Sequence, residues 1–280
     1  MKIQTLTIVG VGLIGGSIGL AAKSRGLAGH IVGVGRQRSS LDEALAVGAI
    51  DEASLDLAET ASRSSLVVFC TPVDRIVEQV LSVAGRCAAG TLLTDAGSTK
   101  EAIVHGIEGQ LPADVHFVGS HPLAGSEKKG PRFADPNLYV DRLAIVTRTP
   151  RTDAAALDRT AAFWQSLGCR VRVMDPQDHD RALAMTSHLP HLAASALAGL
   201  LPDELRDFCA TGFRDTTRVA AGDPSIWTGI FEQNRSALLA ALDLLEARIV
   251  EYRRALELND RASLDRLLVE GKKARTSLDC

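Results

Sequence analysis

The sequence predicts an α/β fold in which an N-terminal, mostly parallel sheet is followed by an all-helical C-terminal domain. Short apolar runs recur at fairly even intervals over the first 175 residues, and helical patterns lie between the earlier ones. After residue 174 no further strand pattern is found. Apolar runs that alternate with helices are typical of a parallel sheet covered on both faces.

The length and the composition indicate a globular protein of two domains. The chain has 280 residues, of which 46% are hydrophobic and 23% are charged, enough to bury two cores of ordinary size. Asp175–Pro176 is the expected boundary, because the residue before a proline resists the helical conformation. We therefore expect domains at residues 1–175 and 176–280. The net charge of −3 argues against a nucleic-acid partner.

The cysteines and the N-terminus favour a cytoplasmic protein. Five scattered cysteines contain no CxxC pair, which fits reduced thiols better than disulfides or a zinc site. The segment "MKIQTLTIVGVG" has neither the apolar core nor the cleavage site of a secretory signal. No apolar run reaches the length of a membrane span, so we expect no membrane partner.

Seven apolar runs are predicted strands, and two segments between the earlier runs are predicted helices, over residues 17–26 and 73–85. In the second helix the apolar residues share one face at a period of 3.6. The predicted strands cover residues 6–11, 30–35, 65–70, 91–96, 115–120, 143–147 and 170–174.

The first strand runs into a GxGxxG sequence, a predicted helix follows it, and a second strand comes at the right distance. This is a Rossmann-type arrangement. Its glycines let backbone amides approach a pyrophosphate at the positive end of the helix. The alternative is a purely structural glycine turn. The candidate cofactor-binding residues here are Gly10, Gly12, Leu13, Ile14 and Gly15.

The end of the second strand favours NADP over NAD. An NAD site usually has a carboxylate there for the ribose hydroxyls, but this chain has Gly35, followed by Arg36, Arg38 and Ser39. Two guanidiniums and a hydroxyl could bind a 2′-phosphate. The alternative is two solvated arginines on a loop.

Two further strand ends face the same crevice and add Cys70, Thr71, Pro72 and Asp95 to the candidate cofactor site. Thr71 is expected to cap the following helix, with Pro72 at its first position. Ser98 and Glu101 have the S-x-x-E spacing of a capping box, which is a sufficient structural explanation of Ser98.

His121 follows the next predicted strand, so it is expected at the sheet edge where a nicotinamide would be presented. Histidine is the usual group for moving a proton while a hydride leaves the same carbon. Position, residue type and cofactor agree, and His121 is the candidate catalytic base.

Six segments follow one another along the chain: "GVGLIGGSIGLA", "TDAGSTK", "SHPLAGSEKKG", "NLY", "SHLPH" and "GFRDTTRVAAGDPSIW". In these segments and their order the chain resembles, over nearly its whole length, the prephenate and arogenate dehydrogenases of tyrosine biosynthesis. The resemblance implies an NADP- or NAD-dependent oxidative decarboxylation of prephenate, to 4-hydroxyphenylpyruvate, or of arogenate, to tyrosine. No residue decides between the two substrates.

The resemblance also implies roles for individual residues. His121 would accept the proton of the ring hydroxyl, Ser98 would bond that hydroxyl or His121, and Arg218 would bind a substrate carboxylate. Ser126 would face the substrate. Glu127 would form an ionic gate with Arg214 and Asp215, and the alternative for these three is a solvated surface network.

The helical half is expected to contribute His188 and His191, which lie three residues apart on one face of a helix over residues 180–201. Pro190 is expected to kink that helix. The resemblance places both histidines beside the substrate, and the alternative is two core histidines. His179 matches a recurrent family position without an assigned role. No metal ligand set is found.

A coiled-coil-like apolar stripe runs through residues 236–258, and a second one follows in residues 264–268. Such stripes fit a helix bundle. Because the helical domain makes the dimer in the family that the chain resembles, we expect a homodimer.

Two rival functions remain open from the sequence. One is another NADP-dependent oxidoreductase of hydroxyacid dehydrogenase or imine reductase type, which would carry a catalytic lysine on a helix or no histidine at this place. The other is a non-catalytic NADP-binding sensor, which would have no use for His121 or Arg218.

Overall fold

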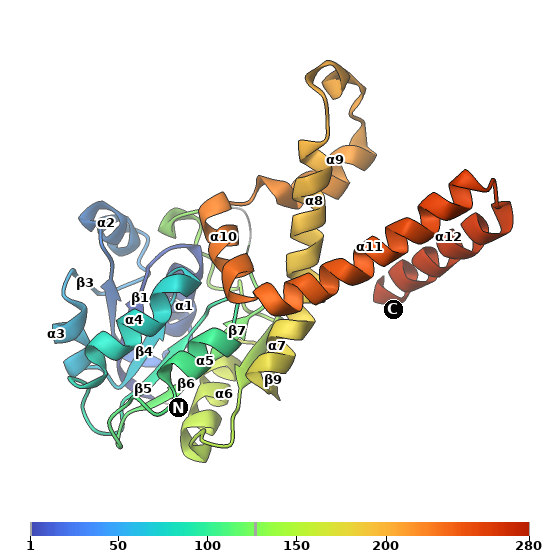
Figure 1. The fold of residues 1–280 in the computed structure, drawn as a ribbon. Coiled ribbons are helices and arrows are strands. Elements are labelled where there is room, and N and C mark those ends of the chain that lie inside the picture. The colour runs from blue at the N-terminus through green and yellow to red at the C-terminus, as the bar shows by residue number, and fades with distance from the viewer. Residues whose placement is uncertain (1, 126–127, 280) are drawn as a thin grey trace. The chain divides into compact units, whose positions relative to one another are not determined.

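The computed structural model describes residues 2–125 and 128–279 (Figure 1). It contains two compact units, residues 1–234 and residues 235–280. This division does not coincide with the boundary expected at Asp175–Pro176, because the helices up to residue 234 belong to the first unit. The first unit therefore combines the sheet with part of the helical half.

A six-stranded parallel sheet forms the centre of the first unit, in the order β3-β2-β1-β4-β5-β6. The order reverses between β1 and β4, which is where such sheets bind ligands at the carboxyl ends of their strands. The predicted fold class is confirmed. The strands are β1 (Ile3–Val9), β2 (Ala28–Val34), β3 (Glu52–Ser54), β4 (Leu66–Phe69), β5 (Leu92–Asp95) and β6 (His116–Val118).

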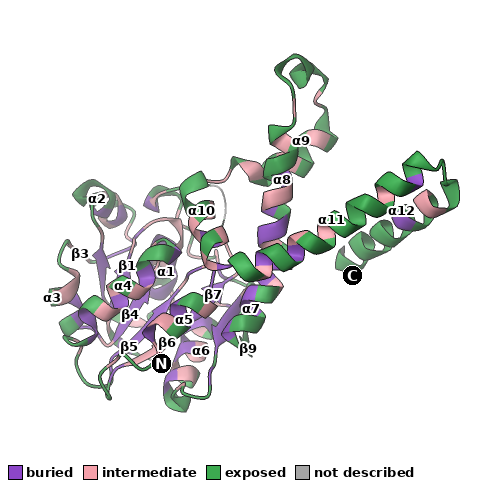
Figure 2. Cartoon of the chain, in the orientation of Figure 1, coloured by how far each residue is buried: buried purple, intermediate pink, exposed green. Residues whose placement is uncertain are grey.

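Helices cover both faces of this sheet, and its central strands β4 and β5 are entirely buried between them (Figure 2). On one face α1, α2 and α6 pack on side chains such as Leu6 and Ile8. On the other face α3, α4 and α5 pack on side chains such as Val67 and Phe69. The helices are α1 (Leu13–Ser24), α2 (Arg38–Ala46), α3 (Leu57–Ser62), α4 (Val73–Ala84), α5 (Glu101–Ile107) and α6 (Ala154–Ser166).

The run over residues 115–120, predicted as one strand, is two strands in different sheets. β6 ends at Val118, and β7 (Ser120–Pro122) pairs antiparallel with β8 (Leu143–Thr147), which pairs parallel with β9 (Arg170–Met174). The chain passes between the sheets at Gly119, where a Cβ atom would lie 2.6 Å from the Thr147 hydroxyl. His121 consequently lies on a strand rather than on a loop.

From residue 176 to residue 276 the chain is helical, as predicted. A π-helical turn over Ala184–His188 precedes Pro190, the residue at which a kink was expected, and in it the Leu189 amide donates to the Ala184 carbonyl. π turns often accompany functional sites. The helices of this part of the first unit are α7 (Pro176–Leu183), α8 (Leu189–Gly199), α9 (Thr211–Thr217) and α10 (Pro224–Gln233), with 3-10 turns at Asp203–Phe208 and Arg218–Ala221. Another 3-10 turn, Pro131–Phe133, lies earlier in the chain, between β7 and β8.

The second unit consists of α11 (Arg235–Glu257) and α12 (Arg261–Thr276), with a final turn at Ser277–Asp279. Arg248 and Glu270 join the two helices through an ion pair of 2.9 Å. Along the predicted stripe of α11, Ile249 and Leu256 are 51% and 62% exposed. A single chain therefore leaves the part of this apolar stripe around Ile249 and Leu256 uncovered.

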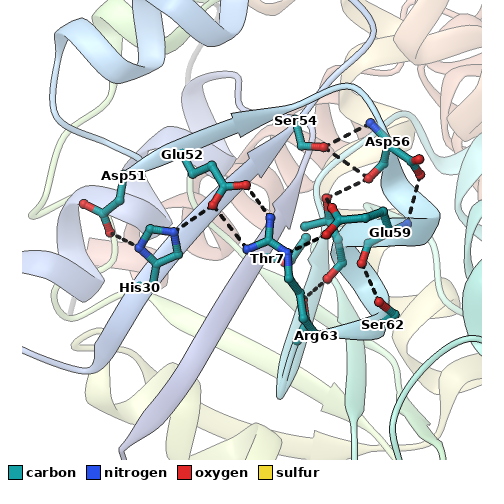
Figure 3. Close-up of polar contacts among 11 residues, drawn as sticks. Thr7, His30, Asp51, Glu52, Ser54, Asp56, Glu59, Ser62 and Arg63 are labelled. Atoms are coloured by element: carbon teal, nitrogen blue, oxygen red, sulfur yellow. Dashed lines mark hydrogen bonds and ion pairs between the residues drawn. The ribbon is translucent and has the colours of Figure 1, made fainter.

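A polar network fixes the edge strand β3 to its neighbours (Figure 3). The Glu52 carboxylate accepts hydrogen bonds from Arg63, at the end of α3, and pairs with His30 on β2 at 3.0 Å. These partners, Arg63 first, lower the pKa of Glu52 to about 2. The network lies at the amino-terminal part of β2, so it supports the sheet edge rather than the ligand side.

Among the residues that the structure describes, no helix is both long enough and apolar enough to cross a membrane.

Gly19 on α1 provides a test of the close contact between this helix and the segment before β3. A Cβ atom there would lie 2.0 Å from the Ala49 carbonyl oxygen. We expect Gly19→Ala to lower the free energy of unfolding by about 1–3 kcal/mol, the usual cost of overpacking, measured by urea denaturation. Gly85→Ala is the matched control, because nothing lies within 4 Å of its Cβ position. Equal stability of the two variants would contradict this packing.

Candidate active site

A cavity of about 960 Å³ opens in the first unit where the strand order reverses. It brings together the glycine-rich loop, the β7 histidine, the helices α7, α8 and α10, and the turn that begins at Arg218. Ten of the residues predicted for the site line it: Gly12, Leu13, Ile14, Gly15, Cys70, Ser98, His121, His188, His191 and Arg218.

The glycine-rich loop fits a bound pyrophosphate. Gly10 has a φ of +90°, and a Cβ atom there would lie 2.8 Å from the Cys70 carbonyl oxygen. A Cβ atom on Gly15 would lie 2.3 Å from the Gly10 carbonyl oxygen, whereas one on Gly12 would meet nothing within 4 Å. The N-cap residue of α1, Gly12, has no side chain that could cap the helix, and the first turn has no acidic residue. The amides at this helix end are thus open to an anion.

The predicted 2′-phosphate residues lie outside this cavity, at the end of β2, where Arg36, Arg38 and Ser39 are all exposed. Arg38 Nε pairs with Asp42 Oδ1 at 2.8 Å. Arg36 makes no ion pair or side-chain hydrogen bond within residues 2–125 and 128–279. Of the two guanidiniums, that of Arg36 is the one available to a ligand.

Both predicted helix caps are wrong. Pro72 is the N-cap of α4, and the Thr71 hydroxyl donates instead to Gln79 Oε1 at 2.6 Å. At α5, Ser98 makes no capping bond. The Asp180 carboxylate on α7 takes its place and accepts from the backbone amides of Lys100 and Glu101, at 2.7 and 2.9 Å. Ser98 is therefore free of the structural role that the capping box offered, and it lines the cavity.

Asp95 does not face the cavity, although it was predicted beside the cofactor. It is fully buried, forms an ion pair with the buried Lys100, and accepts from the Ser120 amide at 2.9 Å. Burial lowers the pKa of Lys100, and Asp95 opposes this shift. The pair holds the backbone immediately before His121.

His121, His179 and Asp180 form a row of three hydrogen-bonded side chains. Its Nδ1 lies 2.9 Å from His179 Nε2, and His179 Nδ1 lies 2.7 Å from Asp180 Oδ1. The exposed fraction is 9% for His121, 0% for His179 and 1% for Asp180. Only His121 of the three lines the cavity. The sequence indicated no role for His179, and it contained no sign that Asp180 would join the site.

Burial keeps these imidazoles neutral. It lowers the pKa of His121 well below the ordinary value, and the neighbouring His179, Lys100 and His188 lower it further. Burial also lowers the pKa of His179, although Asp180 opposes that shift. A neutral imidazole with one nitrogen toward the cavity can accept a proton.

His188 is a second buried imidazole with a nitrogen left over. Asn234 Nδ2 lies 2.9 Å from His188 Nδ1, whereas His188 Nε2 has no hydrogen-bond partner among the described residues. Burial lowers the pKa of His188 to about 4. Its unpaired nitrogen and its position in the cavity wall make it available to a polar ligand group.

His191 stacks on Trp227, with ring centroids 3.5 Å apart and an interplanar angle of 12°. Gly222 allows this arrangement, because a Cβ atom there would lie 2.5 Å from the Trp227 ring nitrogen and 2.9 Å from His191 Cε1. Arg218, between α9 and the following turn, adds an exposed guanidinium to the same wall.

The predicted ionic gate is not assembled in the described residues. Ser126 and Glu127 lie outside them. Arg214 and Asp215 are exposed on α9 and do not line the cavity, and Arg214 Nε donates to the Cys209 carbonyl at 3.2 Å.

Several residues of the cavity wall were missed. Lys129 pairs with Asp223, Lys128 lies over the ring of Phe133, and both lysines line the cavity with Arg142. The two lysines and Asp223 lie in the segments "SHPLAGSEKKG" and "GFRDTTRVAAGDPSIW", on which the family resemblance rests, so the sequence could have pointed to them. Arg142 lies in no such segment.

Within residues 2–125 and 128–279, no three histidine, cysteine or acidic side chains gather as metal ligands would. Four cysteines in the same part of the chain are free thiols.

These features define a class of protein. A parallel sheet with an open glycine-rich helix end, and a neutral histidine across the same cavity, is the arrangement of a nucleotide-dependent oxidoreductase.

Comparison with known proteins identifies the family. Residues 18–173 match the model of the prephenate dehydrogenase nucleotide-binding domain, and residues 175–270 match that of the prephenate dehydrogenase dimerization domain. The chain belongs to the prephenate dehydrogenase family. It is accordingly an oxidoreductase, and the predicted family and enzyme class are confirmed.

Individual relatives agree over almost the full length. The chain is 32% identical to a cyclohexadienyl dehydrogenase of Zymomonas mobilis, over 98% of this chain and 95% of that protein. It is 31% identical to a Bacillus subtilis prephenate dehydrogenase, over 98% and 76%. The crystal structure of Aquifex aeolicus prephenate dehydrogenase with hydroxyphenyl propionate and NAD+ is 30% identical, with a TM-score of 0.93 and 99% coverage of both chains.

A solved arogenate dehydrogenase is also similar. The Synechocystis enzyme is 29% identical, with a TM-score of 0.83 and coverage of 98% of this chain and all of that one.

The buried His188 predicts a loss of stability in acid. Its pKa of about 4 in the folded protein lies below the ordinary value near 6.5, so unfolding favours protonation. The stabilisation is complete above about pH 6.5 and is lost as the pH falls toward about 4, with about 3 kcal/mol at stake. Urea midpoints at pH 7.5 and at pH 4.5 should therefore differ more for wild type than for His188→Gln. His105→Gln, exposed on α5, is the control. An equal drop in wild type and His188→Gln would contradict the shift.

Proposed function

We propose that the protein catalyses the oxidative decarboxylation of prephenate, arogenate or both, in tyrosine biosynthesis. The observation that carries this proposal is His121, a buried neutral imidazole that is tied at Nδ1 to His179 and lines the cavity opposite the glycine-rich loop. A bound nicotinamide dinucleotide supplies the hydride acceptor. The protein supplies the group that accepts the proton and the groups that bind the carboxylates of the substrate.

His121 carries the proton transfer. As the ring carbon that bears the hydroxyl loses hydride, His121 Nε2 accepts the hydroxyl proton. The ring then loses its carboxylate as CO2, the electron pair of that bond completes the aromatic ring, and the proton returns to the oxygen. Ser98, which lines the same cavity, donates or accepts a hydrogen bond at that hydroxyl or at His121.

The helical wall binds the carboxylates. Arg218 suits a carboxylate because its guanidinium is planar, permanently charged and able to bond both oxygens. His188 and His191 each have a buried ring nitrogen without a partner among the described residues, and they contact the substrate side chain in this proposal. A neutral imidazole can donate to a keto group or accept from an amino group. These two ring nitrogens therefore do not discriminate between the side chains of prephenate and arogenate, which supports activity on both substrates.

NADP is the favoured cofactor. The end of β2 has glycine at the position of the usual ribose-binding carboxylate, so no carboxylate at that position repels a 2′-phosphate, and the exposed Arg36 follows it. We assign the pyrophosphate to the amides from Gly12 to Gly15.

The active form is a homodimer in the cytoplasm. The uncovered apolar stripe of α11, with Ile249 and Leu256 more than half exposed, supports association through the second unit. Free thiols at Cys70, Cys87 and Cys169 support a reducing compartment.

Initial rates test the proposal in four combinations: prephenate or arogenate, with NAD+ or NADP+, each followed by reduced nicotinamide and CO2. We expect turnover with NADP+ and an almost complete loss in His121→Asn, about 100- to 10,000-fold in kcat for the removal of a general base. Binding of NADP+ should be unchanged in this variant. Full turnover in His121→Asn would exclude the assigned base, and no turnover of wild type in any combination would exclude the proposed reaction.

Arg36→Ala tests the cofactor assignment. Loss of a charge-assisted hydrogen bond costs about 1.5–3 kcal/mol, so the KM for NADP+ should rise about 10- to 100-fold while the KM for NAD+ stays the same. Arg38→Ala is the matched control and should have a smaller effect, because Asp42 already holds that guanidinium. Equal changes for both cofactors would count against a 2′-phosphate site.

A further inference from the structure

We propose that His179 and Asp180 act as positioning residues that hold His121 in one tautomer, with its proton on Nδ1 and the lone pair of Nε2 directed to the substrate. This inference deepens the proposed function, on which the role of His121 rests. It gives His179, whose place in the family pattern had no assigned role, a specific task.

The first step is the acceptor role of Asp180. Its carboxylate accepts from the amides of Lys100 and Glu101 and lies 2.7 Å from His179 Nδ1. Both of its oxygens already accept a backbone amide, so the carboxylate is an acceptor toward His179 as well. His179 Nδ1 must therefore carry a proton and donate it.

The second step passes along the imidazoles. A neutral histidine has one N–H group, so His179 Nε2 is an acceptor once Nδ1 carries the proton. Its partner at 2.9 Å, His121 Nδ1, must then be the donor. Because burial keeps His121 neutral as well, its Nε2 has no proton. The ring nitrogen available to the cavity is therefore an acceptor before any ligand binds.

The third step is the rigidity of the chain. Asp180 is held at its carboxylate by the start of α5 and at its carbonyl by Asn234 Nδ2, at 2.8 Å. His179 is fully buried, and its ring meets that of His121 edge to face, with centroids 5.1 Å apart. Asp180 thus cannot shift without breaking the hydrogen bonds that cap the start of α5.

His179 and Asp180 also affect how easily His121 is protonated. The groups that oppose protonation of His121 are His179, Lys100 and His188, while Asp180 and Asp95 favour the protonated form of the adjacent His179. Replacing His179 removes one opposing group and leaves the Asp180 carboxylate without its imidazole partner. Protonation of His121 should then become easier.

The direct test is the tautomer itself. Two-bond ¹H–¹⁵N spectra of protein labelled with ¹⁵N-histidine distinguish a protonated ring nitrogen from a bare one. At neutral pH we expect wild-type His121 to have a proton on Nδ1 and none on Nε2, and His179→Phe to populate the opposite tautomer. A proton on Nε2 of wild-type His121 would overturn the inference, whether or not the protein turns over any substrate.

Kinetics separate positioning from mere folding. In His179→Phe we expect kcat to fall about 100-fold or more, as when a catalytic histidine loses its tautomer partner, with the KM and the NADP+ affinity unchanged. His179→Gln should recover part of the rate, because its amide oxygen can accept from His121 Nδ1. The acid limb of the pH profile of kcat/KM should move to higher pH in both variants.

Val80→Ala is the matched structural control, since Val80 is fully buried in α4 and outside the cavity. It should lower thermal stability yet leave kcat per NADP+-binding site and the acid limb unchanged. If His179→Phe behaves like this control, His179 is structural only and the inference is wrong. An inactive wild type with the expected His121 tautomer would instead overturn the proposed reaction and leave the positioning chain supported.

Discussion

The Asp180 carboxylate is the constraint on which the site depends. It caps the start of α5 by accepting two backbone amides, and in the proposed mechanism it sets, through His179, the donor and acceptor roles of the His121 imidazole. This buried carboxylate thus links α5, which packs on the N-terminal sheet, to α7, the helix that follows β9. A buried charge is stable only where it is fully hydrogen-bonded, so the geometry of this group tolerates little change.

The second buried charge pair lies beneath the same histidine. Asp95 ends β5, pairs with Lys100 and receives the amide of Ser120, while the Ser120 hydroxyl bonds Thr94 and Trp164 at 2.8 Å. This network holds the point where the chain leaves one sheet and enters the other. Removing one member of such a pair typically costs about 3–5 kcal/mol. The position of His121 is consequently determined from its backbone as well as from its ring.

The sequence predicted the parts of the site that follow from local patterns. Apolar runs and glycine spacing indicated the sheet and the open helix end at Gly12. They did not indicate the passage at Gly119 into β7, the strand that carries His121. The sequence reading also failed where a distant residue takes over a local role: Asp180 replaces Ser98 as the cap of α5, 82 positions further along the chain. No periodicity encodes such a contact. The contact of His179 with His121 was missed for the same reason, because it exists only once the two segments lie side by side.

In the proposed mechanism, His121 Nε2 receives the proton of the substrate hydroxyl. A crystal structure with NADP+ and an unreactive substrate analogue that keeps the ring hydroxyl should place this oxygen about 2.6–3.2 Å from His121 Nε2, within hydrogen-bond reach, while His121 Nδ1 still contacts His179. A hydroxyl bound away from His121, or an imidazole turned so that Nδ1 meets the ligand, would exclude this role of His121.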